Sequence, residues 1–336
     1  MQTNENNTVR TEITGVGMYV PDKVLDNKYF ENILDTSDEW IKTRTGISER
    51  RILEKGGTSV LATKAAEDLI KSNNINPEEI DVIIVATITP DHFFPSTACL
   101  VQNNIGAKNA WAFDLSAACS GFLFALQTGT SFIEAGKYKK VLVIGADKMS
   151  SISDYEDRNT CILFGDGAGA VLLEPTTNLE YGIQDSKLHV DGSGKDLLVM
   201  KAGGSAFPAS EETVKNKEHF IYQDGKAVFK VAVKSMADIT EEVLIKNNLT
   251  GDDIAYLVPH QANLRIIDAT ARRIKLTPEK VLINIQKYGN TTAATIPLCM
   301  AEAYKEGKFK KGDKLMLTAF GGGFTWGALY LVWSID

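Results

Sequence analysis

Short runs of valine, isoleucine and other apolar residues alternate with longer amphipathic segments along most of the chain, and this alternation limits the possible folds. The runs predict buried strands at residues 82–87, 110–115, 141–146, 168–173, 255–259, 281–285 and 315–320. The longer segments predict helices at residues 59–71, 120–135, 226–246, 262–275 and 292–306. Strands that are apolar on both faces are covered on both faces, so the pattern predicts an α/β fold with helices on both sides of a sheet.

Residue types at the helix ends support these boundaries. Thr36 and Glu39 have the spacing of a capping box before a short helix at 40–45, and Gly46 can end that helix in the left-handed conformation. Gly136 can end the longer helix that precedes it in the same way.

The composition excludes several classes of protein. The chain has 336 residues, and domains average roughly 150 residues, so we expect about two domains. Its 36 basic and 43 acidic residues give a net charge of −7, whereas general binding to nucleic acid or to an anionic membrane needs a broad positive field. No run approaches the ~20 apolar residues that cross a bilayer. We therefore expect neither nucleic acid nor a membrane as a partner.

The cysteines and the N-terminal residues indicate the cellular compartment. Four widely spaced cysteines form no CxxC pair, and the histidines form no HExxH pattern, so we expect a reducing environment and no zinc site. Residues 1–9 are polar, lack the apolar stretch of a signal peptide, and are expected to form a flexible tail. Together these features predict a cytoplasmic protein.

Two stretches of the sequence resemble each other. Residues 141–175 and residues 314–333 both read as a strand, a glycine-rich turn and a second strand. A duplication would explain the similarity, with one half at 10–178 and the other at 179–336, joined near 174–182. Two unrelated strand–turn–strand pieces would explain it equally well.

Cys119 is the first candidate catalytic residue. It follows the strand predicted at 110–115 and lies directly before the helix predicted from Ser120, where unpaired backbone N–H groups and the helix dipole favour a thiolate. Small residues on either side allow a tight backbone turn. The alternative is a buried structural cysteine, as we expect the other three to be.

A histidine and an asparagine are further candidates. His260 directly follows the strand predicted at 255–259, and active sites of α/β proteins form where strands end. Its imidazole can move protons near neutral pH, or it can simply cap a helix. Asn290 stands in a turn before a helix and can serve as its N-cap, or its amide can donate a hydrogen bond to an oxyanion.

Two glycine runs and one basic segment remain. Residues 165–169 lead into a strand, and neither GxGxxG nor GxxxxGK[ST] occurs, which argues against nucleotide binding through those motifs. The run at 321–323 either presents a backbone N–H to a substrate oxygen or forms a tight hairpin. The segment 263–275 is basic in an acidic chain, so its arginines form either a solvated face or a site for an anionic partner.

Taken together, these motifs resemble those of a known family. DLSAACSGFLFAL around Cys119, VPHQANLRI around His260, YGNTTAATIP around Asn290 and FGGGFTWG at 320–327 resemble the signature blocks of the β-ketoacyl-acyl-carrier-protein synthase III family. Further matching blocks extend the resemblance over almost the whole chain. It implies a thiolase-like α/β fold with two duplicated halves in a five-layered αβαβα arrangement, and a homodimer.

The resemblance also implies a reaction, the decarboxylative Claisen condensation that starts fatty-acid chains. Cys119 would attack an acyl-CoA primer, and the backbone N–H groups of Cys119 and Gly322 would hold the oxyanion. Malonyl-acyl carrier protein would then lose CO₂, and His260 and Asn290 would stabilise the enolate that attacks the acyl-Cys119 thioester. No metal or redox cofactor is required.

The resemblance assigns further residues by motif position. Those expected to bind CoA are Trp40, Arg44, Thr45, Arg158, Gly225, Phe229 and Asn263. Those expected to dock the carrier protein are Lys230, Arg265, Arg272 and Arg273. Phe320 and, from across the dimer, Phe94 are expected to close the acyl pocket. Residues 186–218 are longer than in the shortest members of the family, and inferences about acyl specificity are weakest there.

Other proteins on this fold share parts of the pattern. A starter enzyme for a specialised metabolite would carry all of these motifs, and a type III polyketide synthase is a related acyltransferase. A degradative thiolase would carry a second catalytic cysteine in the last glycine-rich loop, where this chain has none. A non-catalytic partner subunit would be expected to lack Cys119, whose presence favours an enzyme. The identity of the acyl primer stays open.

Overall fold

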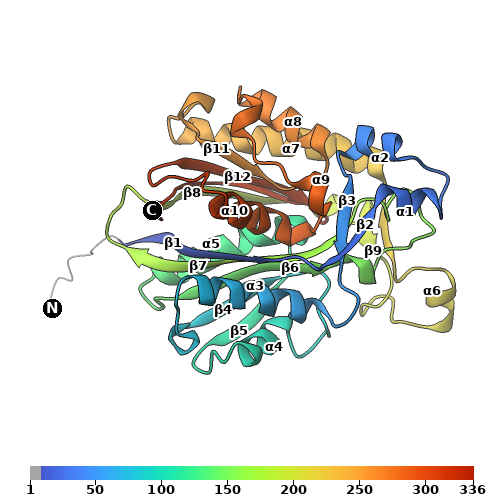
Figure 1. Ribbon diagram of the computed structural model, residues 1–336, viewed down its shortest axis with the longest axis horizontal. Helices are drawn as coiled ribbons and strands as arrows, with labels where there is room; N and C mark the ends of the chain where they lie inside the picture. Colours follow the sequence, from blue (N-terminus) through green and yellow to red (C-terminus); the bar gives the residue numbers. More distant parts are fainter. Residues whose placement is uncertain (1–8) are drawn as a thin grey trace.

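Two mixed sheets form the centre of the computed structural model, which describes residues 9–336 (Figure 1). The first sheet, in the order β1-β7-β6-β4-β5, contains β1 (Arg10–Tyr19), β4 (Val82–Ala86), β5 (Trp111–Leu115), β6 (Val141–Lys148) and β7 (Asp166–Thr176). The second, in the order β8-β13-β12-β11, contains β8 (Gly182–Val190), β11 (Tyr256–Pro259), β12 (Lys314–Gly321) and β13 (Thr325–Val332). Two small antiparallel sheets pair β2 (Lys23–Asp26) with β3 (Glu49–Ile52), and β9 (Leu198–Met200) with β10 (Ile221–Gln223).

The two large sheets have the same internal order. In the first, β7 pairs antiparallel with β1 and β6, and β4 pairs parallel with β6 and β5. In the second, β13 pairs antiparallel with β8 and β12, and β11 pairs parallel with β12. A single parallel bridge from Leu257 of β11 to Val281 stands where the first sheet has β5. This repeated order favours a duplication as the source of the sequence similarity, and the expected boundary at 178 falls in the connection between β7 and β8.

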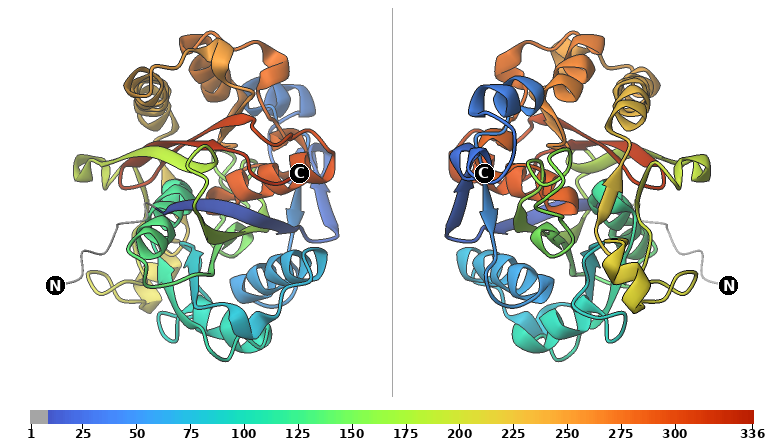
Figure 2. Two further views of the ribbon diagram at one scale, coloured as in Figure 1. Left: turned by 90° about the vertical axis from the view of Figure 1, so that its left-hand side faces the viewer. Right: turned by 90° about the vertical axis from the view of Figure 1, so that its right-hand side faces the viewer.

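Helices complete the expected five-layered arrangement, which is confirmed (Figures 1 and 2). The first sheet is covered on its outer face by α3 (Thr58–Ser72) and α4 (Thr97–Asn104). Between the sheets lie α5 (Gly121–Glu134) and α10 (Thr295–Lys305), and the second sheet is covered outside by α7 (Gly225–Lys246) and α8 (Leu264–Arg273). The alternation of side chains along β4 explains the layering, because Val82 and Ile84 pack in the central core while Ile83 and Val85 pack in the outer one.

One predicted strand is wrong. Of residues 281–285, only Val281 makes a bridge, and α9 (Ile285–Tyr288) follows. The side chain of Gln261 explains the difference, because its Oε1 accepts hydrogen bonds from the backbone N–H groups of Asn284 at 3.1 Å and Ile285 at 3.2 Å. The other predicted strands and helices are present, with small shifts at their ends.

The predicted capping box is also wrong. The helix α2 (Asp38–Thr45) begins after Ser37, whose Oγ accepts a hydrogen bond from the Trp40 N–H at 3.1 Å. Gly46 and Gly136 have φ values of 84° and 71° and follow α2 and α5, as predicted. Sequence patterns did not predict the strands β1, β2, β3, β8, β9 and β10, or the helices α1 (Asn27–Glu31), α4, α6 (Glu211–Lys215) and α9. The tail predicted at residues 1–9 lies outside the described residues except for Val9.

Candidate active site

One large pocket gathers the residues that the sequence motifs singled out. Its volume is about 980 Å³, and its lining includes Cys119, His260 and Asn290. It also includes residues that follow β4 and the last residues of β12. The connections at the carboxyl ends of strands from both sheets therefore line the same cavity, as expected for an α/β active site.

Cys119 lies in the turn between β5 and α5. Ala118 has a positive φ of 48°, and residues 118–120 form a 3₁₀ turn before α5 begins. Burial raises the pKa of the Cys119 thiol to about 12, and the nearby Asp147 carboxylate adds to this, while a hydrogen bond from the Cys119 backbone N–H opposes it. The resting group is therefore a thiol and not the expected thiolate, because desolvation outweighs the effect of the helix terminus.

His260 directly follows β11 and is almost completely buried, with 1% of its surface exposed. Its backbone N–H donates to the carbonyl oxygen of Thr318 at 2.8 Å, which fixes the start of the turn. Its Nδ1 lies 2.7 Å from the hydroxyl oxygen of Thr295, the first residue of α10. Burial lowers the pKa of His260 to about 3, so the imidazole is neutral near pH 7.

Asn290 joins the second unit of the fold to the first. Its backbone N–H donates to the Leu163 carbonyl at 2.8 Å, and its carbonyl accepts from the Gly165 N–H at 3.1 Å. Its side-chain Oδ1 accepts from the Thr292 N–H at 2.8 Å. Within residues 9–336, its Nδ2 makes no hydrogen bond and stays available to a ligand. The predicted N-cap role of Asn290 is wrong, because the N-caps here are Thr291 for the 3₁₀ segment 292–294 and Ala294 for α10. The oxygen instead closes a turn onto the Thr292 N–H, and the amide keeps the alternative role of a donor.

The glycine run after β12 packs against the turn that carries Cys119. A Cβ on Gly321 would lie 2.6 Å from the Cys119 backbone nitrogen, so this close approach requires glycine. Gly321 and Gly322 both line the pocket. The sequence analysis assigned an oxyanion contact to Gly322 and missed the packing role of Gly321.

Aromatic and cationic side chains surround the mouth of the pocket. The guanidinium carbons of Arg44 and Arg158 lie 4.9 and 5.0 Å from the ring centroid of Trp40, although Arg158 is not itself part of the lining. The Arg265 guanidinium lies 4.7 Å from the ring centroid of Phe229. Three further residues expected to bind CoA also line the pocket, namely Thr45, Gly225 and Asn263.

The three other residues expected to dock the carrier protein differ in their surroundings. Arg273 forms ion pairs with Asp238 and, at 3.0 Å, with Glu241, so its charge is compensated. Arg272 on α8 and Lys230 on α7 are exposed and form no ion pair within the part of the chain that the structure describes. Arg272 and Lys230 therefore present uncompensated positive charge on the surfaces of α8 and α7.

The apolar part of the lining includes residues that the sequence analysis missed. Phe320 is buried and lines the pocket, whereas Phe94 is 86% exposed and is not part of the pocket of its own chain. The apolar lining residues that were not predicted include Ile88, Ile152, Phe164, Leu198 and Ile221. The apolar run at 197–200 and the residue after the strand at 82–87 were the available sequence signals.

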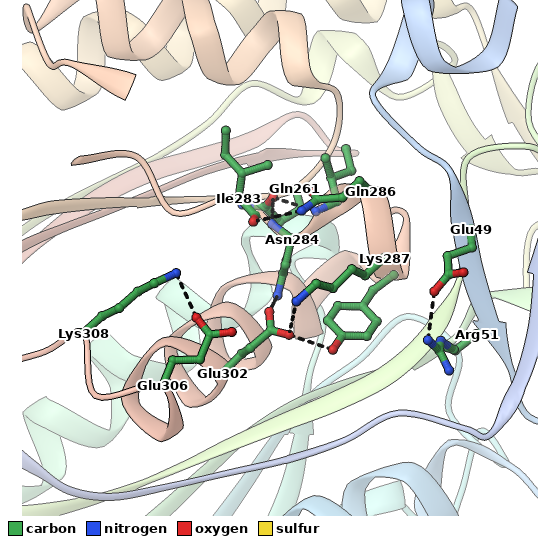
Figure 3. Close-up of polar contacts among 12 residues, drawn as sticks. Glu49, Arg51, Gln261, Ile283, Asn284, Gln286, Lys287, Glu302, Glu306 and Lys308 are labelled. Atoms are coloured by element: carbon green, nitrogen blue, oxygen red, sulfur yellow. Dashed lines mark hydrogen bonds and ion pairs between the residues drawn. The ribbon is translucent and has the colours of Figure 1, made fainter. Parts of the chain in front are cut away.

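A network of polar side chains lies next to the pocket residues His260 and Asn290 in the sequence, and Figure 3 shows it. Gln261 holds the backbone at Asn284, whose Nδ2 donates to Glu302 of α10 at 3.0 Å. The other Glu302 oxygen accepts from the Tyr288 hydroxyl at 2.8 Å and from the Lys287 ammonium at 3.0 Å. Burial and the Glu302 carboxylate raise the pKa of Tyr288. The network fixes the segment that precedes Asn290 to the helix that carries Thr295.

Within residues 9–336, no group of three or more His, Cys, Asp or Glu side chains is placed to hold a metal ion. No helix in the same part of the chain is both long enough and apolar enough to cross a lipid bilayer.

Comparisons with known proteins agree with this architecture. Residues 113–192 match the family described as 3-oxoacyl-[acyl-carrier-protein (ACP)] synthase III, and residues 244–333 match its C-terminal domain. The β-ketoacyl-[acyl-carrier-protein] synthase III of Chlorobaculum tepidum is 58% identical over 97% of this chain and 100% of its own length. The crystal structure of 3-oxoacyl-[acyl-carrier-protein] synthase III from Aquifex aeolicus has 49% identity and a TM-score of 0.89, over 96% of this chain and 100% of that one. The priming β-ketosynthase of the R1128 polyketide pathway has 33% identity and a TM-score of 0.89, over 97% and 96%.

Proposed function

The chain belongs to the 3-oxoacyl-[acyl-carrier-protein] synthase III family, and from this premise we propose a role for each residue of the pocket. The protein is an acyltransferase with a thiolase-like fold that condenses an acyl-CoA with malonyl-acyl carrier protein. One observation carries the assignment of roles: a single pocket contains a buried thiol, a neutral imidazole and an amide with a free donor.

In the first step, Cys119 attacks the thioester carbonyl of acyl-CoA. A bond forms between Cys119 Sγ and the acyl carbon, the bond to the CoA sulfur breaks, and the thiol proton leaves with CoA as the free thiol. The backbone N–H groups of Cys119 and Gly322 stabilise the oxyanion. Gly321, the neighbour of Gly322, packs against the Cys119 backbone, and both Cys119 and Gly322 line the pocket, which supports this pairing of donors.

In the second step, malonyl-acyl carrier protein loses CO₂, and His260 and Asn290 stabilise the enolate oxygen. Asn290 donates from Nδ2. The neutral His260 donates from Nε2 only when its Nδ1 accepts a hydrogen bond. The Thr295 hydroxyl, 2.7 Å away, can donate to Nδ1 by turning from the Thr292 carbonyl oxygen, its acceptor at 2.9 Å in this structure. The enolate carbon then attacks the carbonyl carbon of the acyl-Cys119 thioester, and the bond from that carbon to Cys119 Sγ breaks. The departing thiolate takes up a proton from solvent and becomes the thiol again.

The mouth of the pocket supports a path for CoA. Trp40 and Arg158 would enclose the adenine, and Arg44 would bind the phosphates. Thr45, Gly225, Phe229 and Asn263 would line the pantetheine path. Lys230, Arg265 and Arg272 would attract the acidic carrier protein, and Arg273 contributes less because it is already paired. Every step uses side chains and backbone groups, so the proposal needs no metal or redox cofactor.

We also propose a homodimer and a cytoplasmic location. Phe93 and Phe94 are 80% and 86% exposed, and large apolar side chains exposed side by side favour a protein–protein contact. In that arrangement Phe94 would close the acyl pocket of the partner. The composition and the absence of disulfide-type cysteine spacing support the cytoplasmic location.

The experiment that tests the function is condensation with a panel of primers. The protein should convert malonyl-acyl carrier protein to β-ketoacyl carrier protein, detected by intact-protein mass spectrometry. Acetyl-, branched- and longer acyl-CoA primers distinguish fatty-acid initiation from a specialised starter role. The specialised role is included because the chain is similar to a polyketide priming enzyme. Failure to form product with any primer would contradict the proposal.

A further inference from the structure

We infer that Thr292, held in place by Asp147, is a positioning residue that orients the Asn290 amide, one of the two hydrogen-bond donors of the second step. The inference rests on the role proposed above for Asn290. Thr292 lines the pocket beside this residue, and neither the sequence motifs nor the proposed mechanism gives it a role.

The backbone of Thr292 is unusual for its residue type. Its φ is +52°, a left-handed conformation that β-branched residues rarely adopt because of crowding around Cβ. The residue is also 1% exposed. Glycine or asparagine would serve better if the position only had to turn the chain. A threonine in this conformation indicates that its side chain is needed there.

Asp147 holds this conformation from the other unit of the fold. It lies near the end of β6 and is fully buried. One carboxylate oxygen accepts hydrogen bonds from the Thr292 hydroxyl and, at 3.2 Å, from the Ala293 N–H. The other accepts from the Thr87 hydroxyl at 2.9 Å and the Ile88 N–H at 2.8 Å. A buried carboxylate of the first unit thus fixes a turn of the second.

The N–H of Thr292 fixes the orientation of the Asn290 side chain. It donates to Asn290 Oδ1 at 2.8 Å, which leaves the Asn290 Nδ2 for the enolate. The Thr292 carbonyl oxygen accepts a hydrogen bond from the Thr295 hydroxyl at 2.9 Å, which ties the turn to the start of α10. A rotation at Thr292 would release the Asn290 amide. Thr292 therefore controls the orientation of this donor.

Three substitutions at Thr292 test the inference in the separate half-reactions. Thr292→Val removes the hydroxyl, and we expect kcat for condensation to fall about tenfold or more with KM for malonyl-acyl carrier protein little changed. Acylation of Cys119 by acyl-CoA should stay within about twofold of wild type, because it does not use the Asn290 amide. Thr292→Ser keeps the hydroxyl and should restore kcat. Thr292→Gly relieves the positive φ, so it should fold well and still lose kcat.

Thr11→Val is the matched control. Thr11 is also fully buried, its hydroxyl donates to the Thr130 carbonyl at 3.4 Å, and it is not part of the pocket lining. We expect this variant to keep wild-type kcat. Equal losses of acylation and condensation in Thr292→Val and Thr292→Gly would overturn the inference, as would an unchanged kcat in both.

A double-mutant cycle separates this inference from the proposed roles. If Thr292 acts through Asn290, Thr292→Val should slow decarboxylation of malonyl-acyl carrier protein much less in an Asn290→Ala background than in wild type. Additive losses would overturn the inference and leave the role of Asn290 standing. Normal decarboxylation by the single variant Asn290→Ala would overturn both the inference about Thr292 and the proposed role of Asn290.

Discussion

The two units of the fold have the same strand order, yet corresponding turns carry different chemistry. The turn before α5 in the first unit holds Cys119, and the turn before α10 in the second holds Asn290 and Thr292. Both turns contain a residue with positive φ, Ala118 at 48° and Thr292 at 52°, and they contact each other. A repeated backbone therefore places two equivalent turns face to face, and their side chains divide the proposed reaction between them.

The connections after β4 and β11 differ in a similar way. After β11, His260 lines the pocket. After β4, the hydroxyls of Thr87 and Thr89 both donate to Asp147 at 2.9 Å, so the corresponding position is occupied by a buried polar network. In the proposed mechanism, one unit therefore supplies the nucleophile and a buried polar support, whereas the other supplies the hydrogen-bond donors and the basic residues.

The sharpest expected contrast concerns the nucleophile of the first unit. The rate at which iodoacetamide alkylates Cys119 should rise about tenfold per pH unit between about pH 7 and 9, because the raised pKa keeps the thiolate fraction small throughout that range. Peptide mass spectrometry can follow the reaction, with the exposed Cys99 as a reference for reagent quality. If the alkylation rate instead reached a plateau near pH 8, the effect of the helix terminus on the Cys119 pKa would outweigh the effect of burial.

Charge reversal on the second unit should have a smaller effect. We expect Lys230→Glu with Arg272→Glu to raise KM for malonyl-acyl carrier protein about threefold or more at low salt and to flatten its salt dependence, because the attraction is long-range and screened. Arg273→Glu is a poorer probe, since it would face Asp238 and Glu241. Acylation by acyl-CoA is the control and should change little. An unchanged KM at both salt concentrations would leave these residues an ordinary solvated surface.

The strands that could be predicted from sequence are those buried on both faces. β4 and β6 read as continuous apolar runs because helices cover them on both sides. β8 could not be found in this way, because most of it is half-buried or exposed and its sequence mixes polar with apolar residues. Residues 281–285 do not form the predicted strand because the backbone N–H groups of Asn284 and Ile285 donate to the side chain of Gln261, which is distant in sequence. Local patterns do not contain such contacts.

The same limit applies to the site. Cys119, His260 and Asn290 could be singled out because each lies beside a strand end or a helix start and within a recognisable motif. Asp147 and Thr292 could not, because their contact joins residues of different units. The role of Gly321 likewise depends on the distance between its backbone and that of Cys119. These features arise only when the two units pack together.

The division of labour between the units is tested most directly by a crossover of the two half-reactions. Cys119→Ala should acquire no acyl mass from acyl-CoA but should still decarboxylate malonyl-acyl carrier protein. His260→Ala and Asn290→Ala should still acquire the acyl mass, while decarboxylation falls by about 10²–10³, the usual cost of one lost oxyanion donor. The account is contradicted if Cys119→Ala is acylated at the wild-type rate, or if the other two variants decarboxylate normally while failing to acylate.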